Sequence, residues 1–248
     1  MMTLQQVRRD APWQWLQAGW RDFVHAPVVC LTYGGIFVLL GFMITLGLAA
    51  LGFAATIPVA LGGFALVAPV FAVGIYQVSR AFERGETPRF RIIISRFPSR
   101  IAQIAFLSFL LALLLLVWMR VAQILHIIIT PDSPREMGAF LNFLLTDSAG
   151  LTLLAIGSVF GAALATLAFA ISAIAFPMMV DRDVDAITAL ATSFNAVKSQ
   201  PFVMLTWAWL IAFIIGAGIA VVGVGLAVAF PWIALATWHA YRDFIPAE

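Results

Sequence analysis

The chain has 248 residues, of which 63% are hydrophobic and 10% are charged, and its mean hydropathy is +1.03. A soluble domain has roughly 45–50% apolar and about 25% charged residues, so this composition excludes an ordinary soluble protein. It predicts a single integral membrane domain over residues 1–248. The net charge of +2 argues against a nucleic-acid partner, and a single cysteine, Cys30, excludes an internal disulfide bond.

Residues 1–27 contain the first predicted helix, at 11–25. Its apolar side chains, such as Leu16 and Phe23, recur at helical spacing after a predicted cap at Asp10. The pattern favours an amphipathic helix at the cytoplasmic membrane interface over a solvated leader helix, because tryptophan concentrates at headgroup depth. Three tryptophans are expected at that depth: Trp13, Trp15 and Trp20.

Residues 28–79 form a long apolar run. A bilayer crossing takes about 20 residues at 1.5 Å rise per residue, so the run predicts two crossings, at 28–51 and 57–79. Pro69 lies inside the second crossing and predicts a kink. A kink frees backbone carbonyls, which either line a solute site or simply shape the helix. Because no polar side chains stand nearby, we favour shape.

Residues 80–100 form an arginine-rich cytoplasmic loop. Two interpretations stay open, because the arginines either bind anionic lipid or an acidic partner, or only set the topology. The acidic residues Glu83 and Glu86 dilute the charge and support the second interpretation. The six arginines are Arg80, Arg84, Arg89, Arg91, Arg96 and Arg100.

Residues 101–180 are predicted to hold the third and fourth crossings. The third, at 101–130, is longer than a bilayer core requires, which predicts either strong tilt or a break near Trp118–Arg120. A short surface helix is expected at 137–144, and the fourth crossing at 151–179. The fourth crossing carries a face of small residues suited to close helix packing, within the chain or with a second copy. That face is Gly157, Gly161, Ala165, Ala168, Ser172 and Ala175.

Residues 181–200 predict a second amphipathic cytoplasmic helix. Asp183 or Asp185 is expected to cap it, and Lys198 lies near its end, as the helix dipole favours. Its predicted apolar face is Ile187, Leu190, Ala191, Phe194 and Val197. Residues 201–248 then predict the fifth and sixth crossings and a tail, with a second internal proline, Pro231.

The distribution of Lys and Arg predicts the orientation. Short segments on one side hold most of the basic residues, whereas the other side holds Arg135. Since basic loops stay in the cytoplasm, both termini are expected there, in the inner membrane of a bacterium. The count of crossings must then be even, which agrees with six.

The two ends of the chain resemble each other, which predicts a partial internal repeat. Residues of the first helix pair match residues of the last pair 162 positions later. The matches are Gly63 with Gly225, Pro69 with Pro231, Tyr76 with Trp238, Arg80 with Arg242 and Phe82 with Phe244. An even number of crossings separates the two units, so the repeat is parallel; chance similarity between apolar segments is the alternative.

Charge inside a crossing usually marks a transport path or a proton relay. Arg120 is the one candidate for a buried charge, and we favour a side chain that extends to the headgroups from the end of its helix. The three histidines, His25, His126 and His239, are predicted at two different membrane faces, so no metal or cofactor is expected. No catalytic motif is present, and an enzyme is not predicted.

One stretch resembles a known family. Residues 68–80, APVFAVGIYQVSR, and 82–86, FERGE, are similar to a signature of bacterial predicted integral membrane proteins catalogued as domain of unknown function 2189. The segment around Trp20 and that around Gly34 resemble the family too. The resemblance implies six helices in the bacterial inner membrane and implies no activity.

The fold class is therefore an all-α polytopic membrane protein with six crossings, amphipathic interface helices and a partial parallel repeat. The first function hypothesis is a non-enzymatic membrane interaction or assembly component. It would contact lipid and either a partner membrane protein or further copies of itself. The alternative is a permease or channel for an apolar or weakly polar solute. A filled apolar interior along the second and sixth crossings would favour the first, and a polar path there the second.

Overall fold

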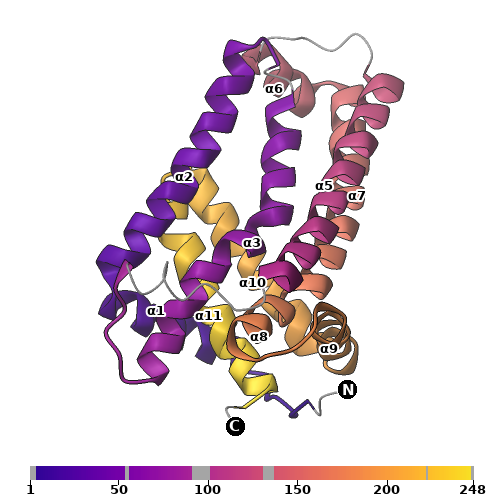
Figure 1. Ribbon diagram of the computed structural model, residues 1–248. Helices are drawn as coiled ribbons and strands as arrows, with labels where there is room; N and C mark the ends of the chain where they lie inside the picture. Colours follow the sequence, from indigo (N-terminus) through magenta and orange to yellow (C-terminus); the bar gives the residue numbers. More distant parts are fainter. Residues whose placement is uncertain (1–3, 54–55, 91–100, 131–136, 222, 247–248) are drawn as a thin grey trace. The chain divides into compact units, whose positions relative to one another are not determined.

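The computed structural model describes residues 4–53, 56–90, 101–130, 137–221 and 223–246. These residues are almost entirely helical, and no strand occurs among them (Figure 1). The helices in chain order are α1 (Ala11–His25), α2 (Pro27–Ala50), α3 (Ile57–Glu83), α5 (Ile101–Ile129), α6 (Met137–Thr146), α7 (Ser148–Ser172), α8 (Ala175–Asp181), α9 (Ala186–Ser199), α10 (Pro201–Ala220) and α11 (Leu226–Phe244).

Five segments in the described part are long and apolar enough to cross a membrane: α2, α3, α5, the run from α7 through α8, and α10. The all-α membrane architecture is thus confirmed. The predicted sixth crossing, α11, is not among the five, because polar residues such as His239, Arg242 and Asp243 in its last turns lower its mean hydropathy. Six crossings and the internal repeat therefore stay predictions.

The chain divides into two compact units. The first comprises Met1–Val38, Pro69–Ser108 and Phe169–Glu248, and the second comprises Leu39–Ala68 and Phe109–Ala168. The division falls inside four long helices rather than between helices. In α3 it falls at Pro69, the predicted kink residue, although α3 stays helical through that position.

The first unit is assembled around α11, where α1 and α2 approach it closely. Gly19 of α1 lies against the backbone of Ala236, and a Cβ added at Gly19 would stand 2.5 Å from the Ala236 nitrogen. Gly34 of α2 meets the backbone of Ala227 in the same way. These glycines let helices pack at backbone distance, as small residues do between membrane helices.

Aromatic side chains fill the space beside these close contacts. Phe37 of α2 stacks on Phe230 of α11, with their ring centroids 3.9 Å apart. Trp15 of α1 is 2% exposed, meets Trp207 edge-on at 5.5 Å and donates a hydrogen bond to Asp243. The Trp15 indole therefore packs inside the first unit, and its depth in the membrane stays a prediction. Trp13 and Trp20 do lie on the exposed side of α1.

The fourth predicted crossing is interrupted between α7 and α8. Pro177 has no N–H to continue the helical hydrogen bonds, which favours a break one turn earlier. The backbone N–H of Ile174 turns to the hydroxyl of Ser193 on α9, at 3.2 Å. The third predicted crossing, by contrast, is a continuous helix, α5, with no break near Trp118–Arg120.

Helix α9 confirms one predicted cap. The Asp185 carboxylate accepts hydrogen bonds from the Thr188 hydroxyl and backbone N–H, and these bonds lower its pKa below the usual value. Small residues such as Ala189 and Ser193 pack inward, and Ile187 and Phe194 of the predicted apolar face are exposed on the other side of the helix. At the first helix, Asp10 bonds Arg8 and Gln14 instead of capping α1.

The second unit is joined by packing around one tryptophan. The Trp118 indole of α5 donates a hydrogen bond to the backbone oxygen of Val59 on α3, at 2.8 Å. The same ring lies against Gly62 of α3 and Gly161 of α7. Helices α5 and α7 run side by side (Figure 1).

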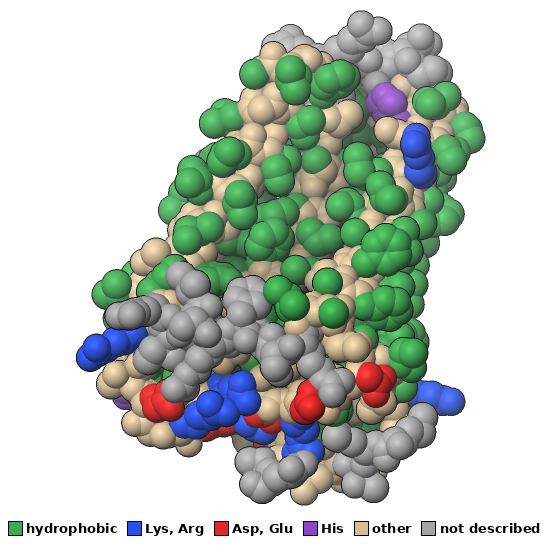
Figure 2. All heavy atoms as spheres, in the orientation of Figure 1, with side chains coloured by type: hydrophobic (Ala, Val, Ile, Leu, Met, Phe, Trp, Pro, Cys, Tyr) green, Lys and Arg blue, Asp and Glu red, His purple; other side chains and the backbone are tan. Residues whose placement is uncertain are grey.

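Much of the outer surface is apolar. Figure 2 shows hydrophobic side chains over the visible faces of the long helices and acidic side chains gathered in one region. Exposed examples include Val28, Leu46, Ile128, Val159 and Phe213. An apolar surface of this extent needs lipid or another protein to cover it.

Candidate functional site

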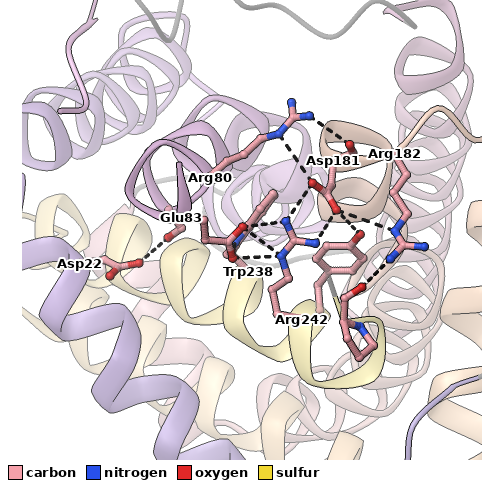
Figure 3. A network of polar contacts seen from close by, with 10 residues as sticks. Asp22, Arg80, Glu83, Asp181, Arg182, Trp238 and Arg242 are labelled. Carbon is pink, nitrogen blue, oxygen red and sulfur yellow. Dashed lines mark hydrogen bonds and ion pairs between the residues drawn. The ribbon is translucent and has the colours of Figure 1, made fainter. Parts of the chain in front are cut away.

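Ends of four helices in the first unit meet in a network of ion pairs and hydrogen bonds, which we call the polar clasp (Figure 3). Its members come from α1, α3, α8 and α11, together with the residue that follows α8. They are Asp22, Ser79, Arg80, Glu83, Asp181, Arg182, Trp238, His239, Tyr241 and Arg242.

Arg242 and Asp181 form the centre of the polar clasp. The guanidinium of Arg242 donates through both terminal nitrogens to the two carboxylate oxygens of Asp181, with Nη2–Oδ1 at 2.9 Å. The side chains are 16% and 12% exposed. A two-point pair between planar groups fixes their orientation as well as their distance. It therefore fastens the end of α11 to the end of α8.

Arg242 also binds a second carboxylate, from α3. Its Nη2 lies 2.7 Å from Oε2 of Glu83, and its Nε donates to both Glu83 oxygens. The Trp238 indole donates to Oε1 of the same carboxylate at 2.7 Å. The Arg242 guanidinium lies over the Trp238 ring, 4.9 Å from its centroid. One arginine thus joins three helices.

Asp181 accepts further hydrogen bonds and lies close to further arginines. The Tyr241 hydroxyl donates to its Oδ2 at 2.7 Å, and Arg80 donates through Nη2 to its backbone oxygen at 3.0 Å. The Nε atoms of Arg80 and Arg182 lie 3.7 and 3.9 Å from its carboxylate. The carboxylate sits among three arginines, so its removal would leave neighbouring positive charges facing each other.

A second group of contacts attaches α1 to the same place. Asp22 is 8% exposed and accepts a hydrogen bond from the Ser79 hydroxyl at 2.6 Å. His239 Nε2 lies 2.8 Å from the same Asp22 oxygen. The aspartate stands between the serine and the histidine, so no serine–histidine contact is formed. This arrangement ties helices and differs from that of a serine nucleophile and its base.

The structure separates the predicted arginine group. Arg80 lies in α3 rather than in a loop, and its guanidinium belongs to the polar clasp. Arg84 and Arg89 are exposed. Arg91, Arg96 and Arg100 lie outside the described residues.

The remaining predicted positions are Arg120, the two prolines inside helices and the two glycines of α7. Arg120 is exposed and bonds Gln123 three residues along the same helix. Whether its charge is buried in the membrane stays a prediction. Pro69 and Pro231 both lie inside continuous helices. Gly161 contacts the Trp118 ring as the small-residue face predicts, whereas Gly157 has open space beside it.

Sequence reasoning missed most of the polar clasp because it searched for charge inside predicted crossings. Glu83, Asp181 and Arg242 stand just beyond the ends of those crossings. One signal did point there, since Arg80 and Arg242 were matched as repeat positions and both contact Asp181. Their matched neighbours Tyr76 and Trp238 also meet, with ring centroids 6.3 Å apart.

The polar clasp can attach the ends of helices to one another. In the described part of the chain, no group of three or more His, Cys, Asp or Glu side chains is placed to hold a metal ion. The members of the polar clasp pair their charges across four helices, although the buried Nε of Arg80 has no hydrogen-bond partner among the described residues. Such a network holds helix ends in fixed positions.

Comparison with known proteins gives one match. A family model described as a predicted integral membrane protein (DUF2189) matches residues 56–181, about half of the chain. Searches of curated proteins and of solved structures found no significant match. The matched residues include α3 and Asp181 and end before α11.

Proposed function

Because the chain belongs to the family of predicted integral membrane proteins catalogued as domain of unknown function 2189, we propose a function that requires no chemistry of its own. The protein is a non-enzymatic interaction or assembly component of the bacterial inner membrane. It holds its own helices rigidly and presents an apolar exterior to lipid and to a partner membrane protein or a further copy of itself.

The observation that carries this proposal is the filled interior of the first unit. Most side chains of α3 and α11 that face inward are apolar or aromatic, including the buried Val73, Ile75, Phe230 and Ile233. The buried polar side chains on these two helices are Gln77, Ser79 and Thr237, toward the end where the polar clasp lies. The charged groups gather at the helix ends, where they bind one another. A permease would need polar groups or water along the same two helices. A filled interior therefore favours an interaction role.

The exposed sides of the two cytoplasmic helices support contact with the membrane or a partner. Trp13, Trp20 and Val24 project from α1, and Ile187 and Phe194 project from α9. Each helix also packs its other side against the first unit. Helices of this kind lie in the interface with their apolar side chains among the lipid headgroups and acyl chains.

We further propose that α11 is the sixth crossing and that both termini are cytoplasmic. The contacts between Tyr76 and Trp238 and between Arg80, Asp181 and Arg242 are compatible with two similar helix pairs that face one another. Reporter fusions test this. A fusion at Gly223, in the turn before α11, should be periplasmic, and fusions at Lys198 and at the C-terminus cytoplasmic. A C-terminal fusion that reads periplasmic would remove the sixth crossing.

The assembly role is tested by purifying the tagged protein from its native membrane in mild detergent, followed by mass spectrometry of what stays bound. A protein recovered in stoichiometric amount, or a stable oligomer of this chain, is the expected result. The matched control is Asp181→Asn, which should loosen the polar clasp and lower the yield of the complex. A monomer with lipid alone, which transports solute after reconstitution into liposomes, would contradict the proposal and favour a permease.

A further inference from the structure

A shallow apolar groove lies on the surface of the first unit where α1 meets α11. It has a volume of about 440 Å³, within the range of sites that hold small molecules or lipid chains. We call it the tryptophan groove, and its lining residues are Trp13, Leu16, Gln17, Trp20 and Trp232. The polar clasp does not include any of these residues.

The walls of the tryptophan groove are held in place before any ligand binds. The Trp232 indole donates a hydrogen bond to the backbone oxygen of Leu16 at 2.8 Å, which fixes the ring of α11 against α1. Trp20 meets Trp232 edge-on at 5.1 Å and stacks on Phe23 at 5.3 Å. A preformed apolar site loses little side-chain entropy when a ligand enters, which favours binding.

A positive charge stands beside this apolar site. Arg21 is exposed and lies one helical turn beyond Gln17, so its guanidinium can reach the end of the groove. Within the described residues it has no ion-pair partner. The neighbouring acid, Asp22, points inward and is occupied by Ser79 and His239. The site thus combines an apolar groove with an available cation.

The position of the groove along the chain places it near the membrane surface. Helix α1 is followed after Ala26 by the membrane-spanning helix α2, which begins at Pro27. Exposed apolar residues continue across this junction at Val24 and Val28. Tryptophan side chains concentrate at the depth where acyl chains meet headgroups. A ligand at this depth is more readily a lipid than a soluble peptide.

We propose that the tryptophan groove binds one anionic phospholipid, whose acyl chain lies on Trp13, Trp20 and Trp232 and whose phosphate contacts Arg21. The apolar lining matches the chain, and the adjacent cation matches the negative headgroup. This site goes beyond the assembly role and does not depend on which protein partner is bound, because all of its residues belong to this chain.

The test uses the full chain in detergent, stripped of lipid and titrated with phosphatidylglycerol, with native mass spectrometry to count bound lipid. One tightly held lipid per chain is expected. The variant Trp13→Ala/Trp20→Ala should weaken its retention about tenfold, a loss equal to about 1.4 kcal/mol. The control is Trp209→Ala, since Trp209 is a 60% exposed tryptophan on α10 outside the groove. Equal retention by both variants would overturn the proposal.

The headgroup contact is tested by comparing phosphatidylglycerol with phosphatidylcholine. Arg21→Gln should remove the preference for the anionic lipid, whereas Arg8→Gln should keep it, because Arg8 already pairs with Asp10. Phosphatidylglycerol with a photoreactive acyl chain provides a check on the unaltered protein. Crosslinks within α1 and at Trp232 are expected. Crosslinks confined to other helices, or a bound protein segment in the groove, would contradict a lipid site.

Discussion

Each of the two units of this chain is stabilised internally by a different kind of contact. In the first, carboxylates and arginines join the ends of four helices, and glycines bring α1 and α2 to backbone distance from α11. In the second, the Trp118 indole joins α5 to α3 and α7 by one hydrogen bond and by ring contacts. The first unit therefore draws its rigidity from contacts within the chain.

The second unit depends more on what surrounds it. Large apolar side chains such as Leu46, Ile128 and Val159 are 66%, 72% and 70% exposed. Lipid tails, or the helices of a partner, must cover them. The contrast shows that polar groups in this protein join the ends of helices, while the long apolar helices leave much of their surface exposed to lipid or to a partner. Each prediction below breaks or sharpens that contrast.

The largest effect is expected for Asp181→Asn. The change removes the charge that holds Arg242 and leaves three arginines close together, so the first unit should lose about 3 kcal/mol of stability. Thermal unfolding in detergent, followed by tryptophan fluorescence, measures this. Asp10→Asn is the control, because the Arg8–Asp10 pair is exposed and should contribute nothing measurable. Equal unfolding temperatures for both variants would show that the polar clasp does not stabilise the fold.

The next prediction compares alanine substitutions at two glycines, one in each unit. Gly34→Ala would place a Cβ against the backbone of Ala227, which cannot yield as a flexible side chain can, so a loss of about 2 kcal/mol is expected. Gly157→Ala should instead stabilise the second unit by about 0.5–1 kcal/mol, since open space surrounds Gly157 and alanine favours helix. The two substitutions should therefore change the unfolding temperature in opposite directions. A loss at Gly157 would reveal a close neighbour at that position.

A smaller effect is expected at Arg120 of the second unit. Its side chain is exposed and its hydrogen-bond partner is Gln123, three residues along the same helix. Arg120→Gln should leave membrane level and unfolding temperature close to those of the original protein. Immunoblots of membrane fractions and the same thermal assay give the answer. A severe loss would mean that Arg120 pairs with a buried group in the membrane.

The smallest effect concerns pH. Hydrogen bonds from Thr188 hold the pKa of Asp185 below its usual value of 3.8, so the carboxylate form stabilises the start of α9. That contribution is complete above the ordinary pKa and is lost as the pH falls through the lowered pKa. Hydrogen exchange of the first turn of α9 should therefore quicken only at acidic pH. Thr188→Ala should shift the change to higher pH, and an unshifted profile would exclude the cap as its cause.

Much of the fold was predictable because apolar runs and proline positions report helices directly. The bounds of α2, α5 and α9 follow the sequence pattern within a few residues, and the cap at Asp185 was among the two predicted. Burial was harder to predict. The sequence pattern around Trp15 is that of an interface helix. The side chain packs inside the first unit because of Trp207 and Asp243, which lie more than 190 residues away in the sequence.

The candidate site was less accessible from the sequence. Hydropathy marks where a crossing ends, and Glu83, Asp181 and Arg242 then read as ordinary polar residues after a helix. Only tertiary structure brings these three ends together. The matched positions Arg80 and Arg242 gave a partial signal, but nothing in the sequence indicated that Asp181 would bind both.

The central claim is that the first unit has a closed, filled interior, and Cys30 offers the most direct test. It is the chain's single cysteine, it lies near the start of α2, and it is fully buried. In inside-out membrane vesicles, a water-soluble maleimide should leave Cys30 unlabelled, while Lys198→Cys in a Cys30→Ser background should react rapidly because residue 198 is exposed on α9. Labelling of Cys30 at the rate of that control would reveal a water-filled path and contradict the account.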